Sequence, residues 1–126
     1  MILYIATIGL PPMTKKNHQR ILYNAKTGKR WIAQSPQYER YERDALRLMA
    51  RPEKTIMVPV NVKLTFFMPT RRKVDLVNLI EAANDILVRR GILLDDNSAI
   101  VVGHDGSRVL YDKEHPRTEI VIEEAE

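Results

Sequence analysis

The pattern of apolar and polar residues predicts four strands and two helices. Residues 2–9 (ILYIATIG) are rich in β-branched and aromatic side chains and predict a strand, which ends at Pro11 because proline cannot donate to a sheet. Residues 57–68 predict a second strand, with Pro59 near its start. Residues 99–103 and 117–123 predict two more strands, and we interpret the segment between them as a hairpin loop.

Two segments repeat apolar residues at helical spacing. Residues 36–50 follow Ser35-Pro36, a capping side chain and a proline suited to the first helical turn, and place Tyr38 and Tyr41 toward a core. Residues 75–90 carry six apolar side chains within an arc of about 120° and end at Gly91. The opposite side of this second helix is polar, except for Val77 and Val88.

The order β-α-β-α-β-β predicts a small α/β fold, a single domain over residues 1–126 with a mixed sheet packed by two helices. The chain has no cysteine, which excludes disulfides and thiolate metal sites. It has no apolar run of the roughly 18 residues needed to span a bilayer and no secretory leader pattern. We therefore expect a cytoplasmic protein without membrane contacts.

Charge is unevenly distributed along the chain. Residues 1–38 contain six lysines and arginines and no acidic residue, which leaves 14 basic and 16 acidic residues for the rest. Within this part, residues 11–34 are polar and basic, with a turn signal at 24–28, and predict either a hairpin of 21–23 with 30–32 or an exposed loop. Such a basic segment indicates a surface that binds a polyanion.

Acidic residues gather around the second helix. Asp75 begins it, Glu81 and Asp85 lie one turn apart on one face, and Asp95 and Asp96 follow before the next strand. Carboxylates at a helix start and at the following strand start can converge at one end of a sheet, where oxygen ligands suit Mg²⁺. The alternative is structural, because acids also cap helices, build turns and line solvated faces.

The stretch DLVNLIEAANDILVRRGILLDDNSAI resembles the RusA family of Holliday junction resolvases. The family pattern is Asp-x-Asp-Asn-x-x-Lys at a helix start, an Asp further along, a Gly, and a hydrophobic residue before Asp-Asp. The segments LPP, KKNHQRI and QSPQYERYE also look like phage and prophage members. The matching positions are Asp75, Asn78, Asp85, Gly91, Asp95 and Asp96.

Two positions depart from this family pattern. Val77 stands where the family has its second acid, and Glu81 stands where it has the lysine. The resemblance implies that Asp75 and Asp96, with Asp95, bind the metal, and that Asn78 and Asp85 support them. Because Glu81 lies one turn beyond Val77, we hypothesise that it replaces the missing acid, and that Lys73, Arg72 or Lys16 replaces the lysine.

These observations together imply a Mg²⁺-dependent endonuclease, with Mn²⁺ as an alternative ion, that cuts four-way junctions in recombination, repair or phage DNA processing. Paired nicks in a two-fold symmetric junction, together with the resemblance, imply a homodimer. No nucleotide-binding glycine motif is present, so no nucleotide cofactor is expected. The predicted catalytic residues are Asp75, Glu81 and Asp96. The predicted DNA contacts are Lys15, Lys16, Asn17, Arg20, Lys29, Arg30, Arg71, Arg72 and Lys73. The alternative is a protein that binds branched or duplex DNA without cutting it.

Overall fold

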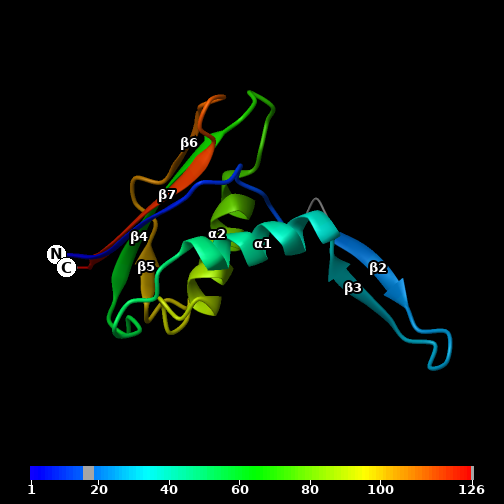
Figure 1. Ribbon diagram of the computed structural model, residues 1–126. Helices are drawn as coiled ribbons and strands as arrows, with labels where there is room; N and C mark the ends of the chain where they lie inside the picture. Colours follow the sequence, from blue (N-terminus) through cyan, green and yellow to red (C-terminus); the bar gives the residue numbers. More distant parts are fainter. Residues whose placement is uncertain (16–18, 126) are drawn as a thin grey trace.

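A five-stranded mixed sheet forms the centre of the fold (Figure 1). Its strands are β1 (Ile2–Ile8), β4 (Val60–Met68), β5 (Val101–Gly103), β6 (Arg108–Tyr111) and β7 (Arg117–Glu124). The computed structural model describes residues 1–15 and 19–125, and the side chains of all of these except Gln19 and Arg20. β7 lies between β1 and β4 and is antiparallel to both. β5 and β6 follow one another along the other edge of β4 and run parallel to it.

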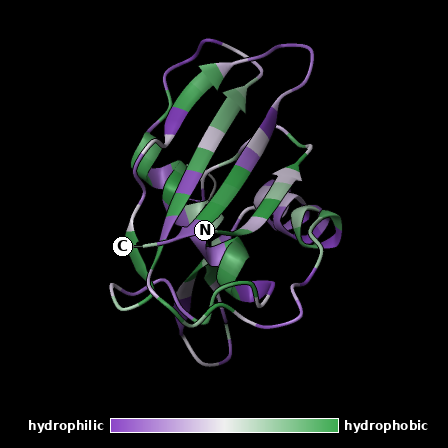
Figure 2. Ribbon diagram, turned by 90° about the vertical axis from the view of Figure 1, so that its left-hand side faces the viewer, coloured by the Kyte–Doolittle hydropathy of each residue, from purple (hydrophilic) through white to green (hydrophobic). Residues whose placement is uncertain are grey.

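Two helices cover one face of this sheet. They are α1 (Pro36–Leu48) and α2 (Leu76–Arg89), and both lie on the side that points away from the viewer in Figure 2. The mixed sheet and the two helices confirm the predicted α/β fold. Neither helix is long and apolar enough to cross a membrane, and no other candidate span occurs among the described residues.

The core lies between α2 and the central strands. Alternate residues of β4 and β7 point toward the helices, and the predicted apolar stripe of α2 packs on them. The side chains that are at most 1% exposed here include Val60, Val62, Leu64, Phe66, Ile120, Ile122, Leu79, Ile86 and Leu87. From α1, Tyr38 and Tyr41 are buried in the same core, as their spacing predicts, with their ring centroids 5.9 Å apart.

Two elements differ from the sequence-based expectation, and a third decides between its two alternatives. β4 begins at Val60 rather than at residue 57, because Pro59 lacks an N–H and the preceding Met57 and Val58 are exposed. The segment interpreted as a hairpin loop contains the short strand β6. Of the two alternatives for residues 11–34, the hairpin is correct, since β2 (Gln19–Tyr23) and β3 (Arg30–Gln34) pair antiparallel as a separate two-stranded sheet.

Two side chains form hydrogen bonds with the backbone of β4 at the gap between β5 and β6. The carbonyl of Val62 accepts a hydrogen bond from His104 Nδ1 at 2.9 Å, and the Leu64 N–H donates to Ser107 Oγ at 2.9 Å. The other ring nitrogen of His104 accepts from the buried amide of Asn84 on α2, at 3.2 Å. These two backbone groups of β4 are therefore hydrogen-bonded although neither β5 nor β6 pairs with them.

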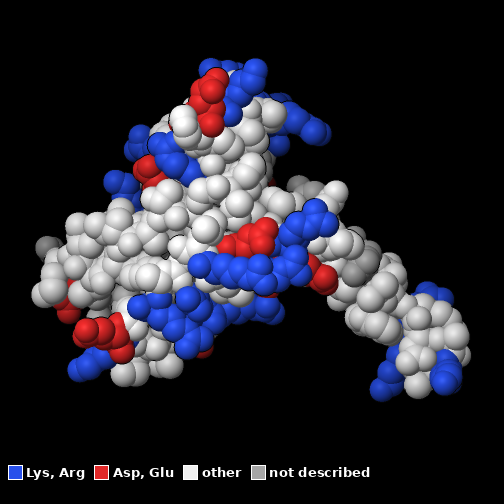
Figure 3. Space-filling model, viewed as in Figure 1, with Lys and Arg blue, Asp and Glu red and all other residues white. Residues whose placement is uncertain are grey.

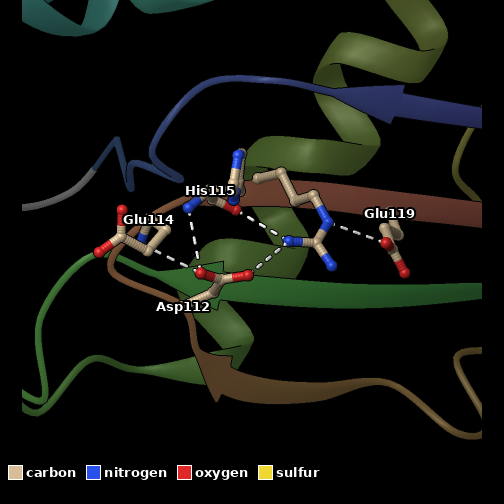
Figure 4. Close-up of polar contacts among 5 residues, drawn as sticks. Asp112, Glu114, His115 and Glu119 are labelled. Carbon is tan, nitrogen blue, oxygen red and sulfur yellow. Dashed lines mark hydrogen bonds and ion pairs between the residues drawn. The ribbon is translucent and has the colours of Figure 1, made fainter.

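Arg117 fixes the connection from β6 to β7 (Figure 4). Its guanidinium donates to Asp112, to the carbonyl of His115 and to Glu119, each at 2.9 Å, and lies 3.8 Å from the centre of the Phe67 ring. The backbone N–H of His115 and the Arg117 side chain hold the pKa of Asp112 below its usual value. This cluster anchors the loop to the open face of the sheet, away from α2.

Candidate functional site

Asp75 is the N-cap of α2. Its Oδ1 accepts hydrogen bonds from the backbone N–H groups of Val77 (2.9 Å) and Asn78 (3.3 Å), which would otherwise lack partners at a helix start. The residue remains exposed. The capping interpretation of Asp75 is therefore correct, and a carboxylate that caps through one oxygen can still offer the other to a ligand.

A second group of acidic residues lies beside the C-terminal end of α2. Asp85, Asp95 and Asp96 line a hollow of about 370 Å³ together with Val88 and Arg89. Asp95 accepts hydrogen bonds from the Asp96 N–H at 2.7 Å and from the Asn97 side-chain amide at 3.0 Å. The predicted turn interpretation of this segment thus holds as well, and both aspartates are exposed.

Two cations flank this hollow. The Lys15 ammonium pairs with Asp85, so the segment that follows β1 reaches α2 at this point. Arg89, which lines the hollow, pairs with Glu42 of α1 and thereby joins the two helices. Both pairs are close, and the Lys15–Asp85 pair is partly shielded from solvent, with 20% and 34% of the side chains exposed. An anion that enters the hollow would meet positive charge as well as carboxylates.

The predicted carboxylates do not converge within one chain. α2 has 14 residues and is about 21 Å long at 1.5 Å per residue, with Asp75 at its start and the Asp85–Asp95–Asp96 hollow beside its last turns. Glu81 lies between them and is half-buried. Among the described residues, no group of three or more Asp, Glu, His or Cys side chains is placed to hold a metal ion.

The reason for this separation is the path of the chain after α2. Gly91 turns the backbone in the left-handed region (φ 80°), and residues 92–96 fold back beside the end of the helix from which they came. Asp95 and Asp96 therefore stay near that end, whereas Asp75 lies at the opposite end. Val77, at the position of the family's second acid, is 68% exposed on the polar side of α2, and Asn78 beside it is half-buried.

Apart from Lys15, the predicted DNA contacts whose side chains are described lie in two exposed places. Arg71, Arg72 and Lys73 form the loop before α2, where the Arg71 guanidinium lies 4.2 Å from the centre of the Tyr111 ring. Arg72 and Lys73 also line a hollow of about 490 Å³ whose other wall is residues 12–14, leading to Lys15. Lys29 and Arg30 belong to the hairpin. Lys16, Asn17 and the side chain of Arg20 lie outside the described residues.

The buried tyrosines of α1 lie close to charged side chains of both helices. Burial raises the pKa of Tyr38 well above its usual value, and the carboxylates of Glu42 and Glu81 raise it further, while Arg89 opposes them. Burial also raises the pKa of Tyr41 to about 12, partly offset by the nearby Thr118 side chain and Met13 backbone, which lower it. Both hydroxyls therefore stay protonated near neutral pH, and neither is available as a base.

Sequence reasoning missed the pairing of Lys15 with Asp85. Lys15 was predicted as a DNA contact, one of six equivalent cations in residues 1–38, and nothing in the sequence distinguishes it as the partner of an acid 70 positions away. The cations proposed to replace the family lysine were Lys73, Arg72 and Lys16. The structure instead pairs Lys15 with Asp85 on the polar face of α2.

Comparison with known proteins identifies the family of this chain. A search of curated proteins returned no matching chain. The family model described as endodeoxyribonuclease RusA matches residues 10–123, which include both helices, the basic loop, the hairpin and every acidic residue discussed above. The chain belongs to the RusA endodeoxyribonuclease family.

Proposed function

We propose that this protein is a Mg²⁺-dependent endonuclease that hydrolyses phosphodiesters in branched DNA, with the four-way junction as its substrate, in recombination, repair or phage DNA processing. The observation that carries the proposal is the hollow of Asp85, Asp95 and Asp96 with Lys15 and Arg89 beside it, in a chain of an endodeoxyribonuclease family. Carboxylates next to cations are what a site needs to hold a divalent ion and a phosphate together.

The donor set suits Mg²⁺. Carboxylates are hard oxygen ligands of the kind that Mg²⁺ prefers, and the ion fills its remaining positions with water. The proposed ligands are Asp95, Asp96, Asp75 and Glu81, and Mn²⁺ is an alternative ion. When bound, the ion supplies Lewis acidity toward the phosphodiester and stabilises the negative charge that develops there.

A homodimer would bring the separated carboxylates together. Because Asp75 and the Asp95–Asp96 pair flank opposite ends of α2, we propose that Asp75 and Glu81 of one protomer face Asp96 of the partner subunit. A two-fold axis repeats this pairing, which yields two equivalent sites for the two strands of a symmetric junction. Lys15 and Arg89 then hold the phosphate, and Arg71, Arg72, Lys73 and the hairpin cations follow the DNA backbone.

A junction cleavage assay tests this function. We expect the wild-type chain to nick a labelled four-way junction in Mg²⁺ and to bind it without cutting in EDTA. Asp96→Asn should lower the cleavage rate by about 100-fold or more and retain binding, because it removes a ligand and no phosphate contact. Glu123→Gln, a change to an exposed carboxylate of β7 on the face of the sheet opposite α2, is the matched control and should cut normally. Cleavage that does not depend on a divalent ion would contradict the proposal.

A second candidate is a protein that binds branched or duplex DNA and does not cut it. The observation that favours it is the exposed Val77, which cannot bind a metal at the position where the family has an acid. The double change Val77→Asp with Glu81→Lys restores the family pattern. If the wild-type chain binds junctions without nicking them in Mg²⁺ or Mn²⁺, and this variant nicks them, the second candidate is correct.

A further inference from the structure

The β2–β3 hairpin forms an arm that stands away from the rest of the molecule (Figure 1). Within the described part of the chain, the two strands pair with each other over residues 19–23 and 30–34 and with no other strand. At the tip, Asn24 Oδ1 accepts from the N–H groups of Lys26 and Thr27, and Gly28 takes a positive φ of 72°, so the turn is well defined. A lone two-stranded ribbon is marginally stable in water, so this arm is expected to be completed by what it binds.

The arm exposes an aromatic ring on each of its faces. Tyr23 lies opposite Arg30, and Leu22 opposite Trp31, so Tyr23 and Trp31 occupy neighbouring positions of the ladder and point to opposite sides of the ribbon. Tyr23 is 60% and Trp31 47% exposed. Arg30 lies 5.9 Å from the centre of the Tyr23 ring, which adds positive charge beside that ring.

Charge identifies the chemistry of the partner. The tip carries Lys26 and Lys29 beside Arg30, and residues 1–38 contain no acidic side chain. Figure 3 shows these basic side chains at the far end of the arm. Two strands with cations at the tip and flat rings behind them match a nucleic acid, which offers phosphates outside and base faces inside. The exposed Ile21 and Ile32 nearer the body can pack on the sugars between.

We propose that this arm recognises the branch point of the DNA, with Tyr23 and Trp31 stacked on the base pairs that end there. The inference rests on the proposed function and adds to it the element that distinguishes a junction from a duplex. In a duplex each base pair is covered by its neighbours, whereas at a branch point the last pair of each arm can expose its face. Rings on opposite faces of one ribbon can each cover one such pair, while Lys26 and Lys29 contact the surrounding phosphates.

The experiment compares binding of a four-way junction and a linear duplex of the same sequence, in EDTA, by the full chain. The test variant is Tyr23→Thr with Trp31→Thr, which removes both rings and keeps residues that favour strands. We expect it to lose at least about tenfold in junction affinity and at most about twofold in duplex affinity. Tyr23→Phe with Trp31→Phe should retain the preference for the junction, because phenyl rings still stack.

Two further variants separate stacking from charge and from general effects. Lys26→Gln with Lys29→Gln should weaken binding to both DNAs by a similar factor and reduce its salt dependence. Ile5→Thr changes an equally exposed apolar residue on β1 and should change neither affinity. Circular dichroism should show that all variants fold, because none of the arm's described side chains belongs to the core cluster.

The outcomes distinguish this inference from the function on which it rests. If the wild-type chain binds no DNA, the proposed function fails. If the wild-type chain prefers the junction and the double threonine variant keeps that preference, the arm does not recognise the branch and the inference is wrong. It is also wrong if sedimentation shows that the double threonine variant turns a dimer into a monomer, because the rings then contact a second copy of the chain.

Discussion

The two buried tyrosines of α1 differ in the surroundings of their hydroxyl groups. The Tyr41 hydroxyl lies near Thr118 and the backbone of Met13, and both lower its pKa. The hydroxyl of Tyr38 has no hydrogen-bond partner among the described residues, although the ring is 1% exposed. A buried polar group without a partner costs free energy, whereas one with partners contributes a little.

Removing the Tyr38 hydroxyl should therefore not weaken the fold. We expect Tyr38→Phe to leave the free energy of unfolding unchanged or to raise it by up to about 1 kcal/mol. Urea denaturation of this variant and of the wild-type chain, with the same m-value for both, measures the difference. A loss of about 1 kcal/mol or more in Tyr38→Phe would show that the Tyr38 hydroxyl has a partner.

The same pair predicts how stability depends on alkaline pH. The pKa of Tyr41 is about 12 in the folded chain, above the value of about 10 expected when unfolded, because burial disfavours the phenolate. This contribution to stability is complete below pH 10 and is lost as the pH rises toward 12. Melting temperatures measured from pH 9 to 12 should fall less steeply for Tyr41→Phe than for the wild-type chain.

At the scale of elements, β4 depends on residues that are not part of any strand. Between β5 and β6 its backbone is paired by His104 and Ser107. Ser107→Ala would leave the Leu64 N–H without a partner in a partly buried place. We expect a cost of about 1–3 kcal/mol in the free energy of unfolding, measured by urea denaturation. Ser98→Ala, in an exposed turn, is the matched control and should change it by less than about 0.5 kcal/mol.

The elements that sequence predicts well are those whose signals are local. α2 has an apolar stripe, a capping aspartate and a closing glycine, and it lies within one residue of its predicted bounds. β6 has four residues, and its pairing partner β4 lies about 40 positions earlier, so no local pattern marks it as a strand. For a related reason the sequence does not decide between a hairpin and a loop at residues 11–34, since the cations there fit an exposed loop equally well.

The candidate site, like the fold, could be predicted from the sequence only in part. The identity of the acids follows from the sequence, because Asp75, Asp95 and Asp96 stand at a helix start and in a turn where their side chains stay exposed. The distance between Asp75 and the Asp95–Asp96 pair does not follow from the sequence, because it depends on the length of α2 and on the direction that the chain takes after Gly91. The partner of Asp85 likewise depends on where the segment after β1 crosses the helix.

At the scale of the whole molecule, the separated carboxylates make a prediction about mixed dimers. If each site combines Asp75 from one protomer with Asp96 of the partner subunit, Asp75→Asn and Asp96→Asn chains should both be inactive alone. Mixed, they form heterodimers in which one site carries both changes and the other carries neither. We expect such mixtures to regain nicking of one strand, at up to about a quarter of the wild-type rate if the chains pair at random.

Denatured and refolded mixtures in several ratios, assayed for nicks in a supercoiled cruciform plasmid, measure this recovery. Mixtures of Asp95→Asn with Asp96→Asn are the control, since both changes affect the same end of α2 and should not complement. No recovery in the first mixture, with heterodimers demonstrated by differently tagged chains, would place the complete site within a single chain.

The pairing of β1 with β7 has a consequence for how this protein reaches its fold. β1 begins at Ile2 and pairs with β7, which begins at Arg117, and the Glu124 N–H donates to the carbonyl of Met1. During synthesis, more than a hundred residues are therefore added after β1 before β7, its pairing partner, leaves the ribosome. β4 also lacks its neighbour β7 until then. Pairings between such distant segments slow folding and expose apolar strands meanwhile. Expression at low temperature or with chaperones should therefore raise the soluble yield.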